Sequence, residues 1–126
     1  MAQSDYSVYN LPALLGRSVK KQDPKNPDRW IRDDDWYREI QQMHFSLFCF
    51  LQANGLVSRE LVKTLDDTSA VVLKQSELTD LGRRFIKSGA DERWLKSFDR
   101  PGSKKDFSST EYMRKALAKL GGGAAK

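Results

Sequence analysis

Apolar residues recur at three- and four-residue steps between residues 36 and 51, which is the spacing of one face of an α-helix. The series consists of Trp36, Ile40, Met43, Leu47 and Phe50. Three aspartates at positions 33–35 precede it and favour a helix start, because carboxylates cap free N–H groups and meet the positive end of the helix dipole. Asn54 and Gly55 supply the left-handed residue that ends a helix. The pattern therefore predicts a core helix between these two signals.

The stretch after this helix predicts one short extended element and a second helix. Residues 58–65 fit either a short helix capped by Ser58 or a strand. Turn-forming residues at 66–69 precede β-branched residues that favour an extended segment at 70–73. Thr79 has the position of an N-cap and Gly89 that of a stop. Gly82 lies inside this helix at a cost of about 1 kcal/mol relative to alanine, so we expect another backbone to pack closely against it.

Two further helices are predicted nearer the C-terminus. The first opens at Asp91, has Trp94 on its apolar edge and ends at residues 100–102. The second begins with a capping box from Ser108 to Glu111 and continues with apolar residues at helical steps. The glycines at 121–123 stop it, so residues 121–126 are predicted to be a flexible tail.

Residues 1–34 are predicted to form a partly irregular N-terminal arm. Prolines 12, 24 and 27 interrupt any long helix, and residues 20–28 have the composition of a polar connector. Residues 11–17 fit a short helical turn, and apolar side chains near them need a surface to cover them. The predicted fold class is mainly α with a minor β element: a compact domain of four to five helices over residues 35–120, with one short strand or hairpin.

The composition is that of one folded domain. The chain has 126 residues, 39% of them hydrophobic, which is enough for a single core. The lone cysteine, Cys49, excludes an intrachain disulfide and fits a reducing compartment. No stretch reaches the roughly 18 apolar residues of a membrane span, and no signal-peptide pattern opens the chain. We therefore expect a cytoplasmic protein with no membrane partner.

Positive charge is concentrated in the C-terminal third. Residues 82–126 carry twelve Lys and Arg against five Asp and Glu, whereas residues 35–81 carry four against seven. A basic surface of this kind meets phosphates or an acidic protein surface, although it also fits a solvated helix face. Trp30 either anchors the N-terminal arm or is offered to a partner. The candidate partner- or phosphate-binding residues are Arg83, Arg84, Lys87, Arg93, Lys96, Lys104, Lys105 and Trp30.

Groups that could carry catalysis are few. His44 is the only histidine, and five residues separate it from Cys49, so on one helix their side chains diverge by about 140°. The acidic residues at 33–35 and 66–67 suit capping and turns, and they lack the alternating ligand spacing of a calcium loop. Neither a phosphate-cradling glycine loop nor a Gly-x-Ser-x-Gly elbow occurs. We therefore expect no enzyme, no metal and no cofactor.

Three motifs between residues 54 and 86 follow one another in a familiar order. They are Asn-Gly-Leu-Val-Ser-Arg at 54–59, Ala-Val-Val-Leu at 70–73 and Leu-Thr-Asp-Leu-Gly-Arg-Arg-Phe at 78–85. This part of the chain resembles the hinge, wing and following helix of winged-helix regulators of the MarR or PadR type, which implies a winged-helix-like fold and nucleic-acid binding. In those regulators a polar, basic helix before the hinge reads the DNA groove, whereas residues 45–51 here are mostly apolar.

These observations favour a small, non-catalytic, cytoplasmic binding module that acts through a protein partner. Its contact surfaces would be the basic C-terminal segment and the N-terminal arm. The alternative is a winged-helix-like nucleic-acid-binding regulator in which the basic residues contact phosphates. The two differ in salt dependence, because each phosphate contact releases counterions.

Overall fold

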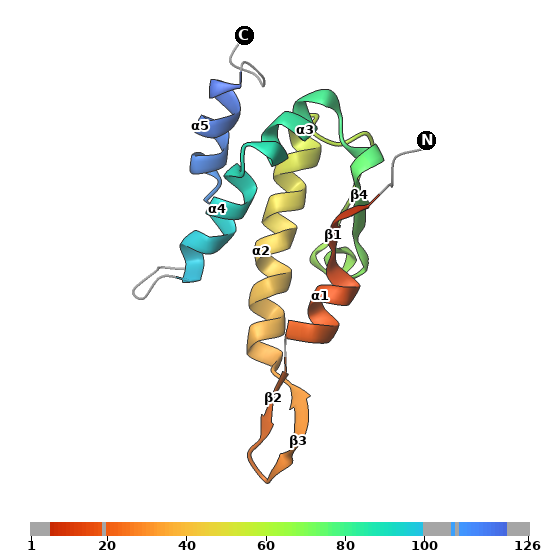
Figure 1. Cartoon of the computed structure of the whole chain (residues 1–126), viewed down its shortest axis with the longest axis vertical. Coiled ribbons are helices and arrows are strands. Elements are labelled where there is room, and N and C mark those ends of the chain that lie inside the picture. Colours follow the sequence, from red (N-terminus) through yellow and green to blue (C-terminus); the bar gives the residue numbers. More distant parts are fainter. Residues whose placement is uncertain (1–5, 19, 100–106, 108, 121–126) are drawn as a thin grey trace.

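The computed structural model describes residues 6–18, 20–99, 107 and 109–120 (Figure 1). Its fold class is mainly α with a minor β component, as the sequence predicted. The elements are β1 (Ser7–Asn10), α1 (Leu11–Ser18), β2 (Lys20–Asp23), β3 (Asn26–Arg32), α2 (Asp34–Ala53), the 3₁₀-helix η1 (Leu65–Ala70), β4 (Val72–Lys74), the 3₁₀-helix η2 (Gln75–Glu77), α3 (Asp80–Lys87), α4 (Ala90–Lys96), the 3₁₀-helix η3 (Ser97–Asp99) and α5 (Glu111–Lys119).

Helix α2 is the central element, and in the view of Figure 1 it lies between α1 and α4. Its predicted ends are confirmed. The Asp33 side chain accepts a hydrogen bond from the Trp36 N–H, and Gly55 follows the C-cap with φ of 68°. The Leu56 N–H then donates to the Leu51 carbonyl over 2.9 Å, which turns the chain back towards the core. The helix contributes seven buried side chains: Ile40, Met43, His44, Leu47, Phe48, Phe50 and Leu51.

The start of α3 is fastened to the exit of α2. Thr79 caps α3 by accepting from the Gly82 N–H at 3.1 Å, and its own N–H donates to the Leu56 carbonyl at 3.0 Å. A Cβ atom at position 82 would lie 1.9 Å from that carbonyl oxygen. The close backbone approach predicted at Gly82 is therefore confirmed, and the Leu56 peptide is the group that approaches.

The segment between α2 and η1 is neither the short helix nor the strand that the sequence allowed. The Gln52 side chain replaces regular backbone pairing there: its Oε1 accepts from the N–H groups of Leu61 and Val62, and its Nε2 donates to the Val62 carbonyl at 2.8 Å. Leu61 and Val62 are buried. The side-chain hydrogen bonds therefore let an irregular segment cross the core with its polar groups satisfied.

The first described residues form the regular elements β1 and α1, which pack on the rest of the domain, in the part of the chain for which the sequence predicted a partly irregular arm. Strand β1 pairs antiparallel with β4, and the Leu11 N–H donates to the Val71 carbonyl at 3.0 Å. Helix α1 extends the helical turn expected at 11–17, and it buries Leu11 and Leu15. These contacts supply the surface that the apolar N-terminal residues need. The extended element expected at 70–73 is strand β4, which begins two residues later than predicted because η1 continues through Ala70.

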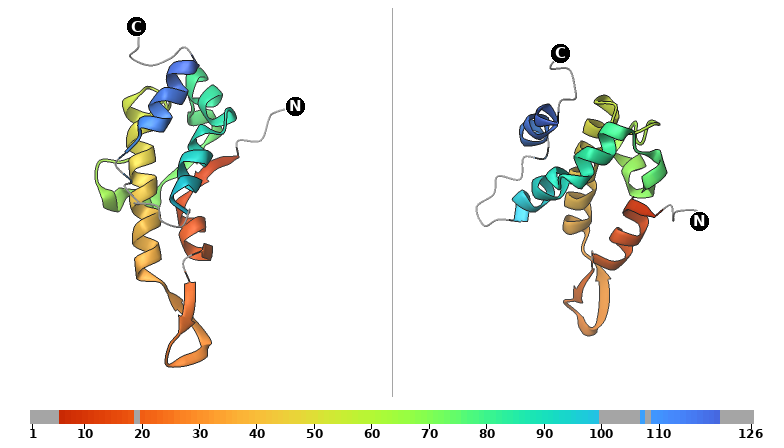
Figure 2. Two further views of the ribbon diagram at one scale, coloured as in Figure 1. Left: turned by 90° about the vertical axis from the view of Figure 1, so that its left-hand side faces the viewer. Right: turned by 45° about the horizontal axis from the view of Figure 1, so that its top comes forward.

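Strands β2 and β3 form a hairpin where the sequence suggested a polar connector. The register pairs Lys20 with Arg32 and Gln22 with Trp30, and then shifts so that Asp23 pairs with Asn26. The Asp23 carboxylate and the Asn26 amide oxygen each accept a nearby backbone N–H and so shape the turn. The hairpin projects beyond the first turn of α2 (Figures 1 and 2). Its side chains are exposed or half-buried throughout.

The C-terminal helices are held in place by an indole hydrogen bond and by buried apolar side chains. Gly89, with φ of 79°, ends α3 as predicted and is also the N-cap of α4. The Trp94 indole N–H donates to the Ser109 carbonyl at 2.8 Å, which connects α4 with the chain entering α5. Helix α5 begins at Glu111 with Thr110 as its N-cap and buries Met113 and Leu117. The expected helix stop at 100–102, the capping residue Ser108 and the tail at 121–126 lie outside the described residues.

Replacing Gly82 with alanine should lower the free energy of unfolding by at least about 2 kcal/mol, because the added methyl group overlaps the Leu56 carbonyl. Urea denaturation measures this. Gly16→Ala is the matched control. Gly16 also lies in a helix, and apart from the adjoining residues of that helix no atom lies within 4 Å of its Cβ position. The free energy of unfolding of this variant should therefore rise by about 0.5–1 kcal/mol. Equal stability of Gly82→Ala and the parent chain would contradict the contact.

Candidate functional site

The structure divides the predicted site residues between two ends of the molecule. Arg83, Arg84 and Lys87 lie on α3, and Arg93 and Lys96 lie on α4. Trp30 lies on the hairpin, at the end opposite α3 and α5 (Figure 1). Lys104 and Lys105 lie outside the described residues. The predicted residues that the structure describes therefore belong to two separate candidate surfaces. One is basic and the other is centred on Trp30.

Two of the predicted arginines contact the C-terminal helix. The Arg93 guanidinium donates from Nε to the Tyr112 hydroxyl oxygen at 2.8 Å and from Nη2 to the Ser88 carbonyl at 2.9 Å. Arg84 donates to the Leu120 carbonyl at 3.4 Å. Arg83 is instead paired with Asp80 on its own helix. Arg84 and Arg93 thus belong to one surface with α5, while Arg83 is partly neutralised.

A groove, here called the basic groove, lies between the start of α4 and α5. Three of its side chains are cationic, two are apolar, and none is a carboxylate. The half-buried Ala116 and Leu120 belong to its apolar part, because both pack against the core cluster. The lining residues are Ser88, Arg93, Tyr112, Lys115, Ala116, Lys119 and Leu120.

Two hydrogen bonds fix the Arg93 side chain in this groove, whereas Lys115 is held only weakly. Lys115 makes an exposed pair with Glu111 at 3.5 Å on the same helix. Exposed pairs of this kind contribute little, because water and salt screen them. An incoming anion can therefore compete with Glu111 for Lys115, and it meets a guanidinium that is already oriented.

Sequence reasoning missed the half of the groove that α5 supplies. Tyr112, Lys115 and Lys119 follow one another at steps of three and four residues, so they lie on one helical face. That spacing was available from the sequence. The partnership between this face and α4 depends on tertiary contacts, which the sequence pattern does not contain.

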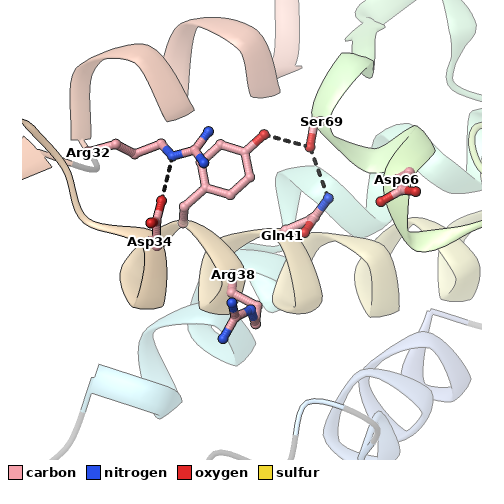
Figure 3. Close-up of a pocket in the computed structure, with 7 residues that line it drawn as sticks. Arg32, Asp34, Arg38, Gln41, Asp66 and Ser69 are labelled. Carbon is pink, nitrogen blue, oxygen red and sulfur yellow. Dashed lines mark hydrogen bonds and ion pairs between the residues drawn. The ribbon is translucent and has the colours of Figure 1, made fainter.

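A second polar hollow, here called the hairpin pocket, lies where the hairpin meets α2 and η1 (Figure 3). The Arg32 Nε donates to Asp34 at 2.7 Å, and its guanidinium lies 4.6 Å from the centroid of the Tyr37 ring. The Tyr37 hydroxyl and the Gln41 amide both donate to the Ser69 hydroxyl oxygen, at 3.0 and 3.1 Å. Arg38 and Asp66 complete the lining. These contacts hold the last residue of β3 against α2.

The two residues considered for nucleophilic catalysis do not meet. His44 is buried against Tyr9 and Phe48, and its Nδ1 lies 2.8 Å from the Ile40 carbonyl oxygen, which only accepts, so Nδ1 carries the proton. Burial lowers the pKa of His44. Cys49 is half-buried on another face of α2, and burial raises the pKa of its thiol, which disfavours the thiolate. This geometry fits packing roles for both side chains.

A buried polar pair joins the first strand to α4. The Tyr9 hydroxyl donates a hydrogen bond to the Asp91 carboxylate across 82 residues of sequence. Asp91 is 2% exposed. Burial raises the pKa of the Asp91 carboxyl, because the charged form loses hydration, although the hydrogen bond from Tyr9 opposes this shift. From the sequence, Asp91 was predicted only to open a helix, and its pairing with Tyr9 was not predicted.

Comparisons with known proteins do not assign either surface. The chain matches no protein-family model, no curated protein and no solved structure. Within the described part of the chain, no three His, Cys, Asp or Glu side chains lie together as a metal-binding group. None of the helices described there combines the length and the apolar character needed to cross a membrane. The functional assignment therefore depends on the geometry of the two surfaces.

Asp91→Asn should gain stability relative to the parent protein as the pH rises from 3 to 7. The pKa of Asp91 is higher in the folded protein than in the unfolded chain. The stability that the protonated Asp91 contributes is therefore fully present below the unfolded pKa, and it is lost as the pH rises through the folded pKa. Asparagine cannot ionise and keeps an oxygen that accepts from Tyr9. Urea denaturation across the pH range measures the difference.

Asp80→Asn provides the control for this experiment, since Asp80 is an exposed carboxylate in the first turn of α3. This variant keeps Asp91, so it should not reproduce the gain expected in Asp91→Asn. A stability difference for Asp91→Asn that stays constant or shrinks as the pH rises would contradict the buried, ionisable pair.

Proposed function

We propose that this protein is a small, non-catalytic binding module that docks an acidic segment of another protein in the basic groove. The observation that carries the proposal is the lining of the groove: Arg93, Lys115 and Lys119 surround an apolar floor, and the lining contains no carboxylate. A free thiol, Cys49, fits a reducing compartment, so we place the protein in the cytoplasm.

The chemistry of the groove supports a segment that carries acidic and apolar side chains together. Lys115, Lys119 and the oriented Arg93 guanidinium suit carboxylates, and a guanidinium can bind a carboxylate through two hydrogen bonds. Ala116 and Leu120 offer apolar surface between these charges, and the Tyr112 ring adds an amphipathic contact. A purely anionic ligand would leave the apolar floor unused.

The alternative proposal, a winged-helix-like nucleic-acid-binding regulator, draws less support from α2. This helix precedes the hinge of the resemblance, where regulators of that type have their groove-reading helix. Here its Leu47, Phe48 and Leu51 are fully buried. A reading helix needs polar side chains free to reach base edges. The protein-partner proposal makes no such demand on α2.

The double substitution Lys115→Glu with Lys119→Glu should weaken binding of an acidic amphipathic peptide by about tenfold or more, because each new carboxylate repels the peptide. The probe is a fluorescein-labelled amphipathic helical peptide with glutamates on one face and leucines on the other. Fluorescence anisotropy measures its affinity. A second peptide with lysine in place of glutamate should not bind.

Lys63→Glu with Lys74→Glu is the matched control. It changes the net charge equally, and Lys63 is paired with Glu60 on its own segment much as Lys115 is paired with Glu111. This pair should change the affinity less than about twofold. Equal losses in both double variants would show that net charge alone attracts the peptide. Salt-sensitive binding of duplex DNA, lost in Lys115→Glu with Lys119→Glu, would favour the nucleic-acid alternative.

A further inference from the structure

We infer that the β2–β3 hairpin is a second docking surface, which takes an extended segment of another protein that carries acidic side chains next to an apolar one. The surface consists of Trp30 and Gln22 on one face of the hairpin, together with Arg32. Arg32 also lines the hairpin pocket, so it connects this face with the pocket. It lies at the opposite end of the molecule from the basic groove (Figure 1) and does not depend on the function proposed for that groove.

Trp30 is the centre of this surface. Its side chain is 60% exposed, whereas Trp94 is buried and Trp36 packs partly against the core. The register pairs Trp30 with Gln22 on the neighbouring strand, so the Trp30 ring lies beside a polar side chain rather than in an apolar cluster. Exposed tryptophans are costly to leave in water and are enriched among the residues that dominate binding energy.

The hairpin as a whole lacks the packing that usually stabilises one. A two-stranded sheet is marginal in water unless a third strand or a helix covers it. Here the side chains of both strands are exposed or half-buried, and the contacts that anchor the hairpin lie at its base, where Arg32 contacts Asp34 and Tyr37. Because the sheet has only two strands, both are edge strands, and an extended segment can pair with either of them. A bound segment would supply the missing cover.

Charge identifies the occupant. Residues 20–32 contain five cationic residues, Lys20, Lys21, Lys25, Arg29 and Arg32, against two acidic ones, Asp23 and Asp28. Complementarity therefore requires acidic side chains on the partner. A second copy of the hairpin would bring like charges together. The apolar ring of Trp30 adds the requirement for an apolar side chain beside the acids.

The same residues favour a protein over a nucleic acid. Asp34 and Asp66 line the pocket into which this face continues, and they repel a phosphate backbone lying along it. Arg32 is also engaged, since it is paired with Asp34 and stacked on Tyr37. A protein segment can place carboxylates beside Lys20, which pairs with Arg32 on the same face as Trp30, and keep them away from the two aspartates.

The test uses the full chain and a displayed library of random linear peptides selected against it. Selected peptides should be enriched in Asp and Glu beside an apolar residue. Labelled copies of the peptides that still bind the groove variant, Lys115→Glu with Lys119→Glu, should lose affinity at least tenfold in Trp30→Ala, as measured by fluorescence anisotropy. Tyr6→Ala is the control, because Tyr6 is 59% exposed and lies outside both surfaces.

The groove variant Lys115→Glu with Lys119→Glu separates the two proposals, since peptides that dock on the hairpin should bind it unchanged. Selected peptides that lose affinity only in the groove variant would overturn the hairpin inference and leave the groove intact. The inference would also be overturned if the peptides that bind the groove variant bind Trp30→Ala as well as the parent chain, or if the library yields no acidic binder. Binding of an oligothymidine probe that needs Trp30, without any peptide, would assign the surface to nucleic acid instead.

Discussion

The contact between Gly82 and the Leu56 carbonyl fixes how the second half of the chain leaves the central helix. The Schellman-type turn at Gly55 brings Leu56 back to the end of α2, and its carbonyl oxygen accepts from Thr79 at 3.0 Å. Only glycine at position 82 lets α3 lie this close. Because Gly89 both ends α3 and caps α4, the direction of α3 also sets that of α4. The Trp94 indole then places the chain entering α5.

The basic groove is a consequence of this arrangement. Its Arg93 comes from α4, and its two lysines and Tyr112 come from α5, so neither helix forms it alone. A second long-range contact, from Tyr9 to the buried Asp91, fastens the other face of α4 to the N-terminal strand. Helix α4 is therefore held from both sides, and the groove has a rigid wall. Preformed walls favour binding because less conformational freedom is lost when a partner docks.

Local signals predicted the helices well, and long-range contacts explain what they missed. The caps at Asp33 and Thr79 can be predicted from the sequence because each acts through neighbouring backbone groups. At Gly82 the sequence predicts a close backbone approach, but only the fold identifies the Leu56 peptide as the group that approaches. The hairpin at residues 20–32 looked like a connector because its side chains are polar on both faces, so no alternation marked it. The irregular segment after α2 depends on Gln52, whose hydrogen bonds span nine and ten residues.

The candidate site was predicted in part. Its Arg93 on α4 was predicted from the concentration of positive charge, but the partner face on α5 appears only once the two helices are brought together. The most direct measurement is an NMR titration of the labelled protein with the acidic amphipathic peptide. If the groove is the docking site, amide shifts will concentrate at Ser88, Arg93 and residues 112–120, with little change around Lys63 and Lys74. Shifts of equal size at lysines all over the surface would contradict it.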